Sequence, residues 1–346
     1  PPPFHAEDGI RDDLEGLVGS EMCIRDRGQI VSPGGARFDM HLKGSGQTAF
    51  SRGGDGRSAL GPVLREYLVS EAMEKLGVPT TRALAAVTTG ETVAREQLLP
   101  GGVITRIATS FVRVGTFEYF SSRSDLHAVT KLADYVIEHN YPACRDAANP
   151  YLAWLEAIID RQAALIAQWM QVGFIHGVMN TDNMLISGET IDYGPCAYMD
   201  QYDPAMVFSS IDHGGRYAYQ NQPGIAHWNL AAFAQALLPL LDSDRDSAVA
   251  KAQTAIDGFP DLYTAGYHKV MARKLGLQEW RETDDALLGD WLALLAQEQL
   301  DFTLAFRSLT ELATAGSGAL PTFAEVFSLP TVLDPWLARW QQRLQT

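Results

Sequence analysis

Hydrophobic and polar residues alternate along residues 37–43, where polar side chains separate Phe38, Met40 and Leu42. A period of two residues is typical of a strand with one buried face. We therefore predict a half-buried strand, which ends at the glycine-broken sequence KGSGQT. A polar loop rich in arginine and glycine comes next.

After this loop the spacing of apolar residues becomes that of a helix. Pro62 lies where the helix would begin, and Gly77 lies where it would end. One apolar stripe repeats every three to four positions, as on the buried side of an amphipathic helix. The stripe comprises Leu60, Val63, Leu64, Tyr67, Leu68, Ala72 and Leu76.

Two further segments have strand character. Residues 82–98 have the pattern of a hairpin, with two short strands around Thr89–Gly90. Residues 101–120 begin as another strand and then have the composition of a loop. The first part of the chain is thus predicted to be rich in strands, with one prominent helix.

Beyond residue 120 the apolar residues recur at helical spacing. They do so in residues 125–141, 149–173 and 225–242 and over most of residues 243–346. We predict an α+β fold with two lobes. The small, β-rich N-terminal lobe would span residues 28–120, and the larger, helical C-terminal lobe would span residues 121–346.

Composition excludes some classes of protein. Of the 346 residues, 46% are hydrophobic and 20% are charged, as in an ordinary globular protein. The net charge of −15 argues against nucleic-acid binding, which needs a basic surface. No run is expected to span a bilayer, and the N-terminus lacks the regions of a secretory signal. Cys23, Cys144 and Cys196 follow no metal-ligand spacing, so we expect a reduced, cytosolic compartment.

Residues 1–27 differ in pattern from the rest of the chain. They show no sustained hydrophobic period, and their composition does not match that of the folded part. We expect this segment to be non-native or disordered, and we place no function in it.

Residues 176–195, HGVMNTDNMLISGETIDYGP, resemble the active-site motifs of a protein kinase. A kinase has H-R-D-x-x-x-x-N and then D-F-G, in which the Asn and the second Asp hold magnesium. His176, Asn183 and Asp192 keep that order. An amide oxygen and a carboxylate are ligands that Mg²⁺ prefers. We therefore predict that Asn183 and Asp192 bind a divalent metal.

The catalytic base of a kinase is absent from its usual position. That position is occupied by Val178, whereas an aspartate, Asp182, directly precedes Asn183. Asp182 is an acid that could accept a proton from an attacking hydroxyl. The alternative role for Asp182 is to cap the loop.

Phosphate chemistry also needs cations near the metal. Lys43, at the end of the first predicted strand, is the first candidate, as in kinases. The next predicted helix offers two glutamates as its partner, Glu66 and Glu71, and the helical stripe alone does not decide between them.

Two arginines and a glycine-rich loop are further candidates. Arg106 and Arg113 lie in one apolar-flanked stretch, which suggests buried guanidinium groups bound to a triphosphate or to a structural carboxylate. Asp55 and Gly56 lie in the loop sequence GGDGR, where glycine permits close approach of a ligand.

Four stretches carry a resemblance to a known family. They are LKGSGQTAFSRGGDGRSALGPVLREYLVSEAMEKLGVPTTRAL, ITRIATSFVRVGTFE, HGVMNTDNMLISGETIDYGP and GRYAYQNQPGIAHWNL, and they resemble the selenoprotein O family. The resemblance covers residues 28–346. It implies a protein-kinase-like two-lobe fold that binds ATP in an inverted orientation. It also implies transfer of AMP to Ser, Thr or Tyr hydroxyls of proteins, or in some bacterial members UMP from UTP with manganese.

The resemblance also implies roles for individual residues. Lys43 would contact the phosphates, with Glu66 as its ion-pair partner. Asp182 would be the catalytic base. Asn183 and Asp192 would hold Mg²⁺ or Mn²⁺. The residues lining the nucleotide would be Asp55, Gly56, Arg106, Arg113 and Asp192.

The sequence departs from the family pattern at both ends. The family has a glycine-rich nucleotide loop upstream of the lysine strand, and in this chain the segment 1–27 stands in its place. The family's C-terminal segment, with its redox Cys or Sec, is not found after Thr346. We therefore expect the chain to be part of a longer protein.

Three functions remain open on the sequence alone. The first is a protein nucleotidyltransferase of the bacterial cytoplasm with ATP and proteins as substrates, without a nucleic-acid or membrane partner. The second is a kinase-like phosphotransferase, against which Val178 counts. The third is a non-catalytic, nucleotide-binding pseudokinase, which would retain its function when Asp182 is replaced by alanine.

Overall fold

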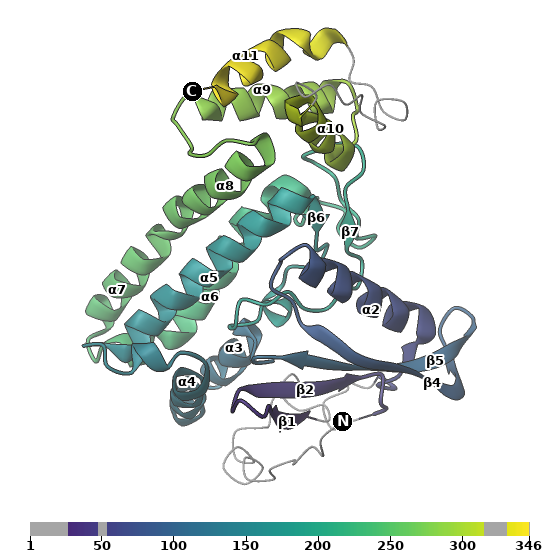
Figure 1. The fold of residues 1–346 in the computed structure, drawn as a ribbon. Coiled ribbons are helices and arrows are strands. Elements are labelled where there is room, and N and C mark those ends of the chain that lie inside the picture. The colour runs from purple at the N-terminus through teal and green to yellow at the C-terminus, as the bar shows by residue number, and fades with distance from the viewer. Residues whose placement is uncertain (1–26, 48–53, 315–330, 346) are drawn as a thin grey trace. The chain divides into compact units, whose positions relative to one another are not determined.

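A computed structural model describes residues 27–47, 54–314 and 331–345 (Figure 1). The segment 1–27 expected to be non-native lies outside this description except for its last residue. The chain divides into two compact units. Unit 1 comprises residues 1–165, 178–194 and 225–259, and unit 2 comprises residues 166–177, 195–224 and 260–346.

The described residues mix helices and strands, in agreement with the predicted presence of both. The strands are β1 (Arg27–Val31), β2 (Arg37–Lys43), β3 (Ser58–Ala59), β4 (Arg82–Ala94), β5 (Leu98–Ala108), β6 (Phe174–Ile175) and β7 (Ala197–Tyr198). The α-helices are α2 (Leu60–Lys75), α3 (Val114–Ser122), α4 (Leu126–Asn140), α5 (Pro150–Val172), α6 (Gln222–Leu241), α7 (Arg245–Asp257), α8 (Phe259–Leu275), α9 (Asp284–Gln297), α10 (Phe302–Thr314) and α11 (Asp334–Leu344).

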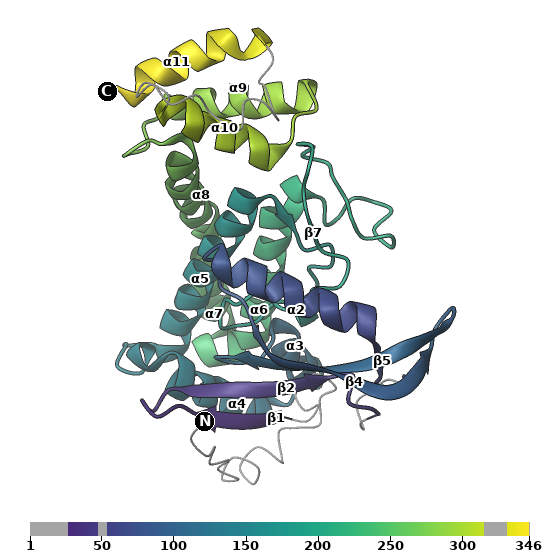
Figure 2. The same ribbon diagram turned by 45° about the vertical axis from the view of Figure 1, so that its right-hand side comes forward.

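Unit 1 contains an antiparallel sheet. The strands lie in the order β1-β2-β5-β3, and β4 also pairs with β5. In the register of β2 and β5, His41 lies opposite Arg106 and Lys43 lies opposite Ile104. Helix α2 packs on β4 and β5 and crosses one face of the sheet (Figure 2). Side chains of β2 and β5 on that face can therefore meet side chains of α2.

The predicted helix is present as α2, but of the predicted stripe only Val63 belongs to its buried residues. The buried residues are Val63, Glu66, Ser70 and Met73, whereas Leu68 is 65% exposed. Leu64, Tyr67 and Leu76 are also exposed. The buried face instead includes Glu66, which pairs with two cations, Lys43 and Arg106. A hydrophobic pattern does not reveal such a pairing.

The strand predicted over residues 37–43 is confirmed as β2. Its most buried side chains, however, are the polar Asp39 and His41, which are 8% and 5% exposed. Asp39 Oδ2 accepts a hydrogen bond from the backbone N–H of Phe111 at 3.1 Å. Partnered polar groups can be buried at low cost, so the polar face of β2 lies inside.

Two local predictions are wrong. Thr89–Gly90 is not the turn of a hairpin but part of an irregularity in β4, where the register with β5 shifts between Thr88 and Thr92. The β4–β5 connection lies further along, where the N–H of Arg95 donates to the carbonyl of Gln97 at 3.0 Å. Residues after β5 form helix α3 rather than only a loop.

The helices predicted beyond residue 120 are confirmed. In unit 1, α3, α5 and α6 meet through the edge-to-face or tilted rings of Phe117, Trp154 and Phe233, with centroids 5.2–5.5 Å apart. One apolar segment, Tyr219–Leu241, is long and apolar enough to cross a bilayer, although the sequence was predicted to contain no such run. Only the length and composition of this segment would fit a membrane-spanning helix. Its helix α6 also supplies Phe233 to the core of unit 1.

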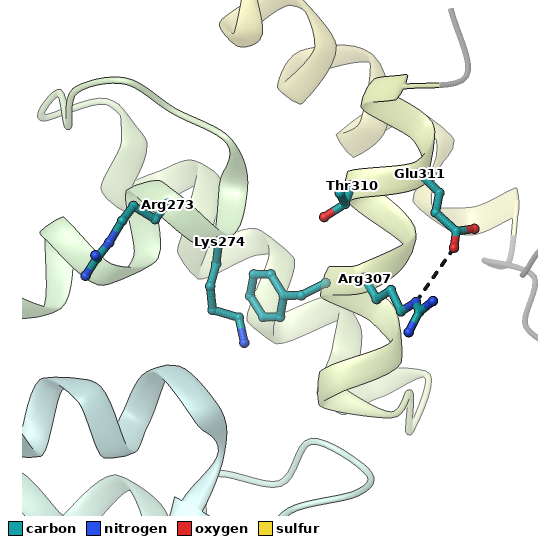
Figure 3. Close-up of a pocket in the computed structure, with 6 residues that line it drawn as sticks. Arg273, Lys274, Arg307, Thr310 and Glu311 are labelled. Atoms are coloured by element: carbon teal, nitrogen blue, oxygen red, sulfur yellow. Dashed lines mark ion pairs between the residues drawn. The ribbon is translucent and has the colours of Figure 1, made fainter. Parts of the chain in front are cut away.

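Unit 2 contains a half-buried lysine, Lys274, on α8. Lys274 Nζ donates to the backbone carbonyl of Gln171 at 2.6 Å and lies 4.2 Å from the ring centroids of Phe302 and Phe306. A hollow of about 500 Å³ opens beside it. Figure 3 shows Lys274 on α8 facing α10, which carries the ion pair of Arg307 and Glu311. Burial lowers the pKa of Lys274 to about 7.

This lysine should give the protein a pH-dependent stability. In the unfolded chain Lys274 titrates near its ordinary pKa of 10.5, so between about pH 7 and that value the unfolded state binds more protons than the folded state. Stability then rises with pH, by at most about 1.4 kcal/mol per pH unit for one proton. Thermal melts between pH 6 and 9 should show this rise relative to Lys274→Met. Parallel curves for the two proteins would contradict it.

Candidate functional site

Four side chains from distant parts of unit 1 form one charge cluster: Lys43, Glu66, Arg106 and Asp192. Lys43 Nζ lies 2.8 Å from Glu66 Oε2 and 2.5 Å from Asp192 Oδ1. Arg106 Nη1 lies 2.7 Å from Glu66 Oε1 and 3.1 Å from Asp192 Oδ1. Each cation therefore contacts both carboxylates, so the four side chains act as one electrostatic unit.

The sheet and α2 explain why these residues meet. His41, Lys43 and Arg106 share one face of the sheet because side chains alternate along a strand and His41 lies opposite Arg106. The guanidinium of Arg106 also contacts His41, with Nη2 2.7 Å from Nδ1. Glu66 comes from the face of α2 that is turned to the sheet.

Burial divides the cluster into an inner and an outer half. The side chains of Glu66 and Arg106 are 2% and 3% exposed, whereas those of Lys43 and Asp192 are 31% and 28% exposed. The outer half can therefore reach a ligand. The inner half, Glu66 and Arg106, holds the side chains of Lys43 and Asp192 in place.

The cluster fixes the charge of its members. Burial alone would raise the pKa of Asp192, but Lys43, Arg106 and Arg113 hold that pKa well below its usual range. Burial likewise opposes the charge on Lys43, yet Asp192 and Glu66 raise its pKa above the ordinary value. The site thus keeps an ionised carboxylate and an ammonium side by side at neutral pH.

The sequence left Glu66 and Glu71 as alternative partners of Lys43. The structure brings Glu66 to Lys43 and places Glu71 elsewhere. Glu71 pairs with Arg82, with Oε1 2.9 Å from Nη2, and both side chains are about one third or more exposed. Its ion pair is therefore at the surface.

The loop that carries Asp182 and Asn183 is attached to the segment before α3. Arg113 Nη1 donates to the backbone carbonyl of Asp182 at 2.7 Å. The N–H of Val114 donates to the carbonyl of Met184 at 3.0 Å. The charge of Arg113 also lowers the pKa of Asp192, so this arginine acts on both parts of the motif. The side chain of Asp182 is half-buried.

Asn183 and Asp192 have the chemistry of a magnesium site. Asn183 Nδ2 donates to the carbonyl of Val178 at 2.9 Å, which orients the amide and leaves the side-chain oxygen as the atom of this amide with the chemistry of a metal ligand. Within the described ranges there is no group of three or more His, Cys, Asp or Glu residues that could hold a metal. A donor set of one carboxylate and one amide oxygen still fits Mg²⁺, which commonly takes one or two protein ligands together with phosphate oxygens and water.

Asp55 and Gly56 lie beside the segment that follows Lys43. The N–H of Gly46 donates to the carbonyl of Gly56 at 3.1 Å. The hydrogen bond from Arg95 and that from the backbone of Arg57 lower the pKa of Asp55 to about 2. Among the described residues, Asp55 thus contacts Arg57 and Arg95.

Gly56 should not tolerate a side chain. Its φ is +64°, and a Cβ would lie 1.8 Å from the carbonyl oxygen of Gly46. We expect Gly56→Ala to lower the free energy of unfolding by more than about 1 kcal/mol. Gly61→Ala is the matched control, because it lies in α2 with nothing within 4 Å of its Cβ. Equal thermal stability of the two variants would contradict this expectation.

Sequence reasoning missed some of the residues that support the site. His41 and Phe111 contact Arg106, the latter with its ring centroid 5.7 Å from the guanidinium carbon. The alternation along β2, which places His41 on the same face as Lys43, was the available signal for His41. His176 belongs to unit 2, where it is fully buried and stacks on Trp169 with centroids 5.4 Å apart.

Comparison with known proteins identifies the family. The family model described as protein adenylyltransferase SelO matches residues 26–346. The chain therefore belongs to the SelO family, and the resemblance noted in the sequence is confirmed.

Similar curated proteins support the same family. A protein nucleotidyltransferase YdiU from Rhizobium etli is 57% identical over 317 residues, which are 92% of this chain and 63% of the relative. One from Methylorubrum populi is 57% identical over 323 residues, covering 92% of this chain and 65% of the relative. The chain thus spans somewhat less than two thirds of the length of these relatives.

Proposed function

We propose that this chain is the kinase-like part of a protein nucleotidyltransferase. It transfers AMP from ATP, or UMP from UTP, to Ser, Thr or Tyr hydroxyls of proteins and releases pyrophosphate. In this proposal residues 28–120 are the N-terminal lobe and residues 121–346 are the C-terminal lobe of a two-lobe fold. Family membership and the names of the relatives support the class of reaction.

The observation that carries the proposal is the charge cluster. Lys43 and Glu66 form the strand-to-helix ion pair of a kinase-like phosphate site, and Asp192 joins them from the motif loop. A triphosphate carries several negative charges. Lys43, at the exposed edge of the cluster, and Arg113, beside Asp192, are cations placed to neutralise them.

The reaction needs a proton acceptor and a leaving group. A hydroxyl oxygen of the target attacks the α-phosphorus, and its proton passes to the carboxylate of Asp182. The bond between the α-phosphorus and the bridging oxygen breaks, and pyrophosphate leaves with the bonding electrons. Asp55 and Gly56 line the nucleotide. Arg106 either binds the nucleotide or holds the carboxylates of Glu66 and Asp192 in place.

Asn183 and Asp192 would hold the divalent metal, Mg²⁺ or Mn²⁺. When bound, the metal supplies positive charge that offsets the negative charge of the phosphates. Asp192 suits this role because its carboxylate stays ionised and partly exposed.

Product analysis separates this function from phosphoryl transfer. The chain would be incubated with ATP and Mg²⁺ or Mn²⁺, and the released nucleotide and phosphate products would be separated by ion exchange. Release of pyrophosphate that is lost in Asp182→Ala supports the proposal. Release of ADP together with a phosphorylated protein would instead establish a phosphotransferase.

The proposed setting is the bacterial cytoplasm. The relatives are bacterial proteins. The proposed partners are ATP and proteins with accessible hydroxyls, without a nucleic-acid or membrane partner. The net charge of −15 supports the exclusion of nucleic acid.

A further inference from the structure

Asp192 has an unusual backbone conformation. Its φ is +65°, in the left-handed region that residues other than glycine rarely adopt. Aspartate tolerates this region better than most residues, but the conformation still has to be held by its surroundings. The contacts on either side of Asp192 therefore bear on where its carboxylate lies.

The backbone before Asp192 is attached to the segment that follows α2. The N–H of Thr190 donates to the carbonyl of Pro79 at 2.9 Å, and the N–H of Thr81 donates to the carbonyl of Thr190 at 3.0 Å. These bonds form a short parallel bridge between Thr80 and Thr190. They fix the approach to Asp192.

The residue after Asp192, Tyr193, is fixed through a hydrogen bond of its own side chain. Tyr193 is 1% exposed, and its hydroxyl is hydrogen-bonded to Thr80 Oγ1, itself in a residue only 7% exposed. Thr80 Oγ1 donates its single proton to the carbonyl of Thr81 at 3.0 Å. Tyr193 is therefore the donor and Thr80 the acceptor, because a threonine hydroxyl has one proton to give.

A second contact joins the same turn to α2. Arg65 Nη1 donates to the carbonyl of Gly194 at 2.6 Å. Arg65 is the neighbour of Glu66, so α2 contacts both the cluster and the end of the motif. The turn itself closes with a bond from the N–H of Gly194 to the carbonyl of Asp192 at 2.8 Å.

We propose that Tyr193 and Thr80 are positioning residues for Asp192. Their hydrogen bond holds the turn after Asp192 against the segment following α2, and so keeps the carboxylate within reach of Lys43 and Arg106. The consequence for metal use rests on the proposed function, whereas the consequence for the conformation of residues 190–194 does not. Both side chains are buried, and neither is proposed as a catalytic residue.

Hydrogen exchange tests the structural part without any assay of activity. Tyr193→Phe keeps the ring and removes the donor, and Thr80→Val keeps the shape and removes the acceptor. Each should increase exchange of the amides of residues 190–194 by about 3- to 10-fold. Thr80→Ser keeps the hydroxyl and should exchange as the wild type does.

A control variant separates this effect from the loss of any buried hydroxyl. Tyr219 is 3% exposed, and its hydroxyl donates to the carbonyl of Met170 at 2.6 Å. Tyr219→Phe should leave exchange of residues 190–194 unchanged. The double variant Tyr193→Phe with Thr80→Val should exchange no faster than the faster of the two single variants, because both remove one bond.

Metal titration tests the functional part. In a nucleotidyl-transfer assay, Tyr193→Phe and Thr80→Val should require about 10- to 100-fold more Mg²⁺ or Mn²⁺ for half-maximal rate. Thr80→Ser and Tyr219→Phe should require as much as the wild type.

Hydrogen exchange and metal titration each test a different part of the proposal. Wild-type exchange in Tyr193→Phe and Thr80→Val would overturn the positioning role, whatever the activity. Faster exchange in a protein that transfers no nucleotide would support the positioning role and count against the proposed function. Faster exchange with an unchanged metal requirement would overturn the claim that the contact positions Asp192 for metal.

Discussion

Replacing Glu66 by glutamine should lower the free energy of unfolding by about 3–5 kcal/mol, the cost of removing one partner from a buried ion pair. Glu66 is 1% exposed and contacts both Lys43 and Arg106. Glutamine has nearly the same shape but no charge, so Arg106 would remain buried with one carboxylate fewer. Urea denaturation of wild type and variant measures the difference.

Glu71→Gln is the matched control, because Glu71 lies on the same helix and also pairs with an arginine. Its pair with Arg82 is exposed, with side chains 34% and 43% exposed. Exposed pairs contribute about 0–1 kcal/mol. Equal losses in the two variants would show that burial of Glu66 in the cluster has no special energetic role.

Replacing Asp192 by asparagine should reduce nucleotidyl transfer by about 10²- to 10³-fold, in line with the loss of a preorganised charge in an active site. Asparagine also tolerates a positive φ, so the backbone at +65° should be kept. The variant loses the carboxylate proposed to bind metal and the negative charge that pairs with Lys43. Initial rates over a range of Mg²⁺ and Mn²⁺ concentrations measure this loss.

Asp242→Asn is the control for this variant. Asp242 also has a pKa held below its usual range, first through its hydrogen bond with Lys251, whose Nζ lies 2.6 Å away. It lies outside the charge cluster, so its loss should leave the rate within about twofold of wild type, the equivalent of roughly 0.4 kcal/mol. Full activity in Asp192→Asn would remove Asp192 from the proposed metal site.

The elements of the site were predictable from the sequence, and the buried faces were not. Alternation predicted the strand that ends at Lys43, and helical spacing predicted α2. Both patterns assume that apolar residues face inward. Here the inward faces carry Asp39 and His41 on β2 and Glu66 on α2, because each finds a partner across the sheet or helix.

The choice between Glu66 and Glu71 shows the same limit. Both lie on α2, and the apolar stripe alone did not decide between them. The partner that decides between them, Arg106, comes from β5, forty residues further along the chain than Glu66. Only the register of β2 and β5 reveals that Lys43 and Arg106 share a face.

Turn signals were also misleading. A Thr-Gly pair between short apolar runs predicts a hairpin turn, and Gly90 does have a positive φ of 75°. The strand nevertheless continues through it as an irregular stretch of β4. Glycine permits a bulge as readily as a turn, so the local sequence did not distinguish the two.

Intact-mass spectrometry of the chain after incubation with ATP and Mg²⁺ or Mn²⁺ tests the central claim most directly. The chain itself can serve as the hydroxyl donor, and nucleotidyl transfer predicts an added mass of one AMP unit. The same incubation with Asp192→Asn should give no adduct. An added mass of one phosphate would contradict nucleotidyl transfer and establish phosphoryl transfer in its place.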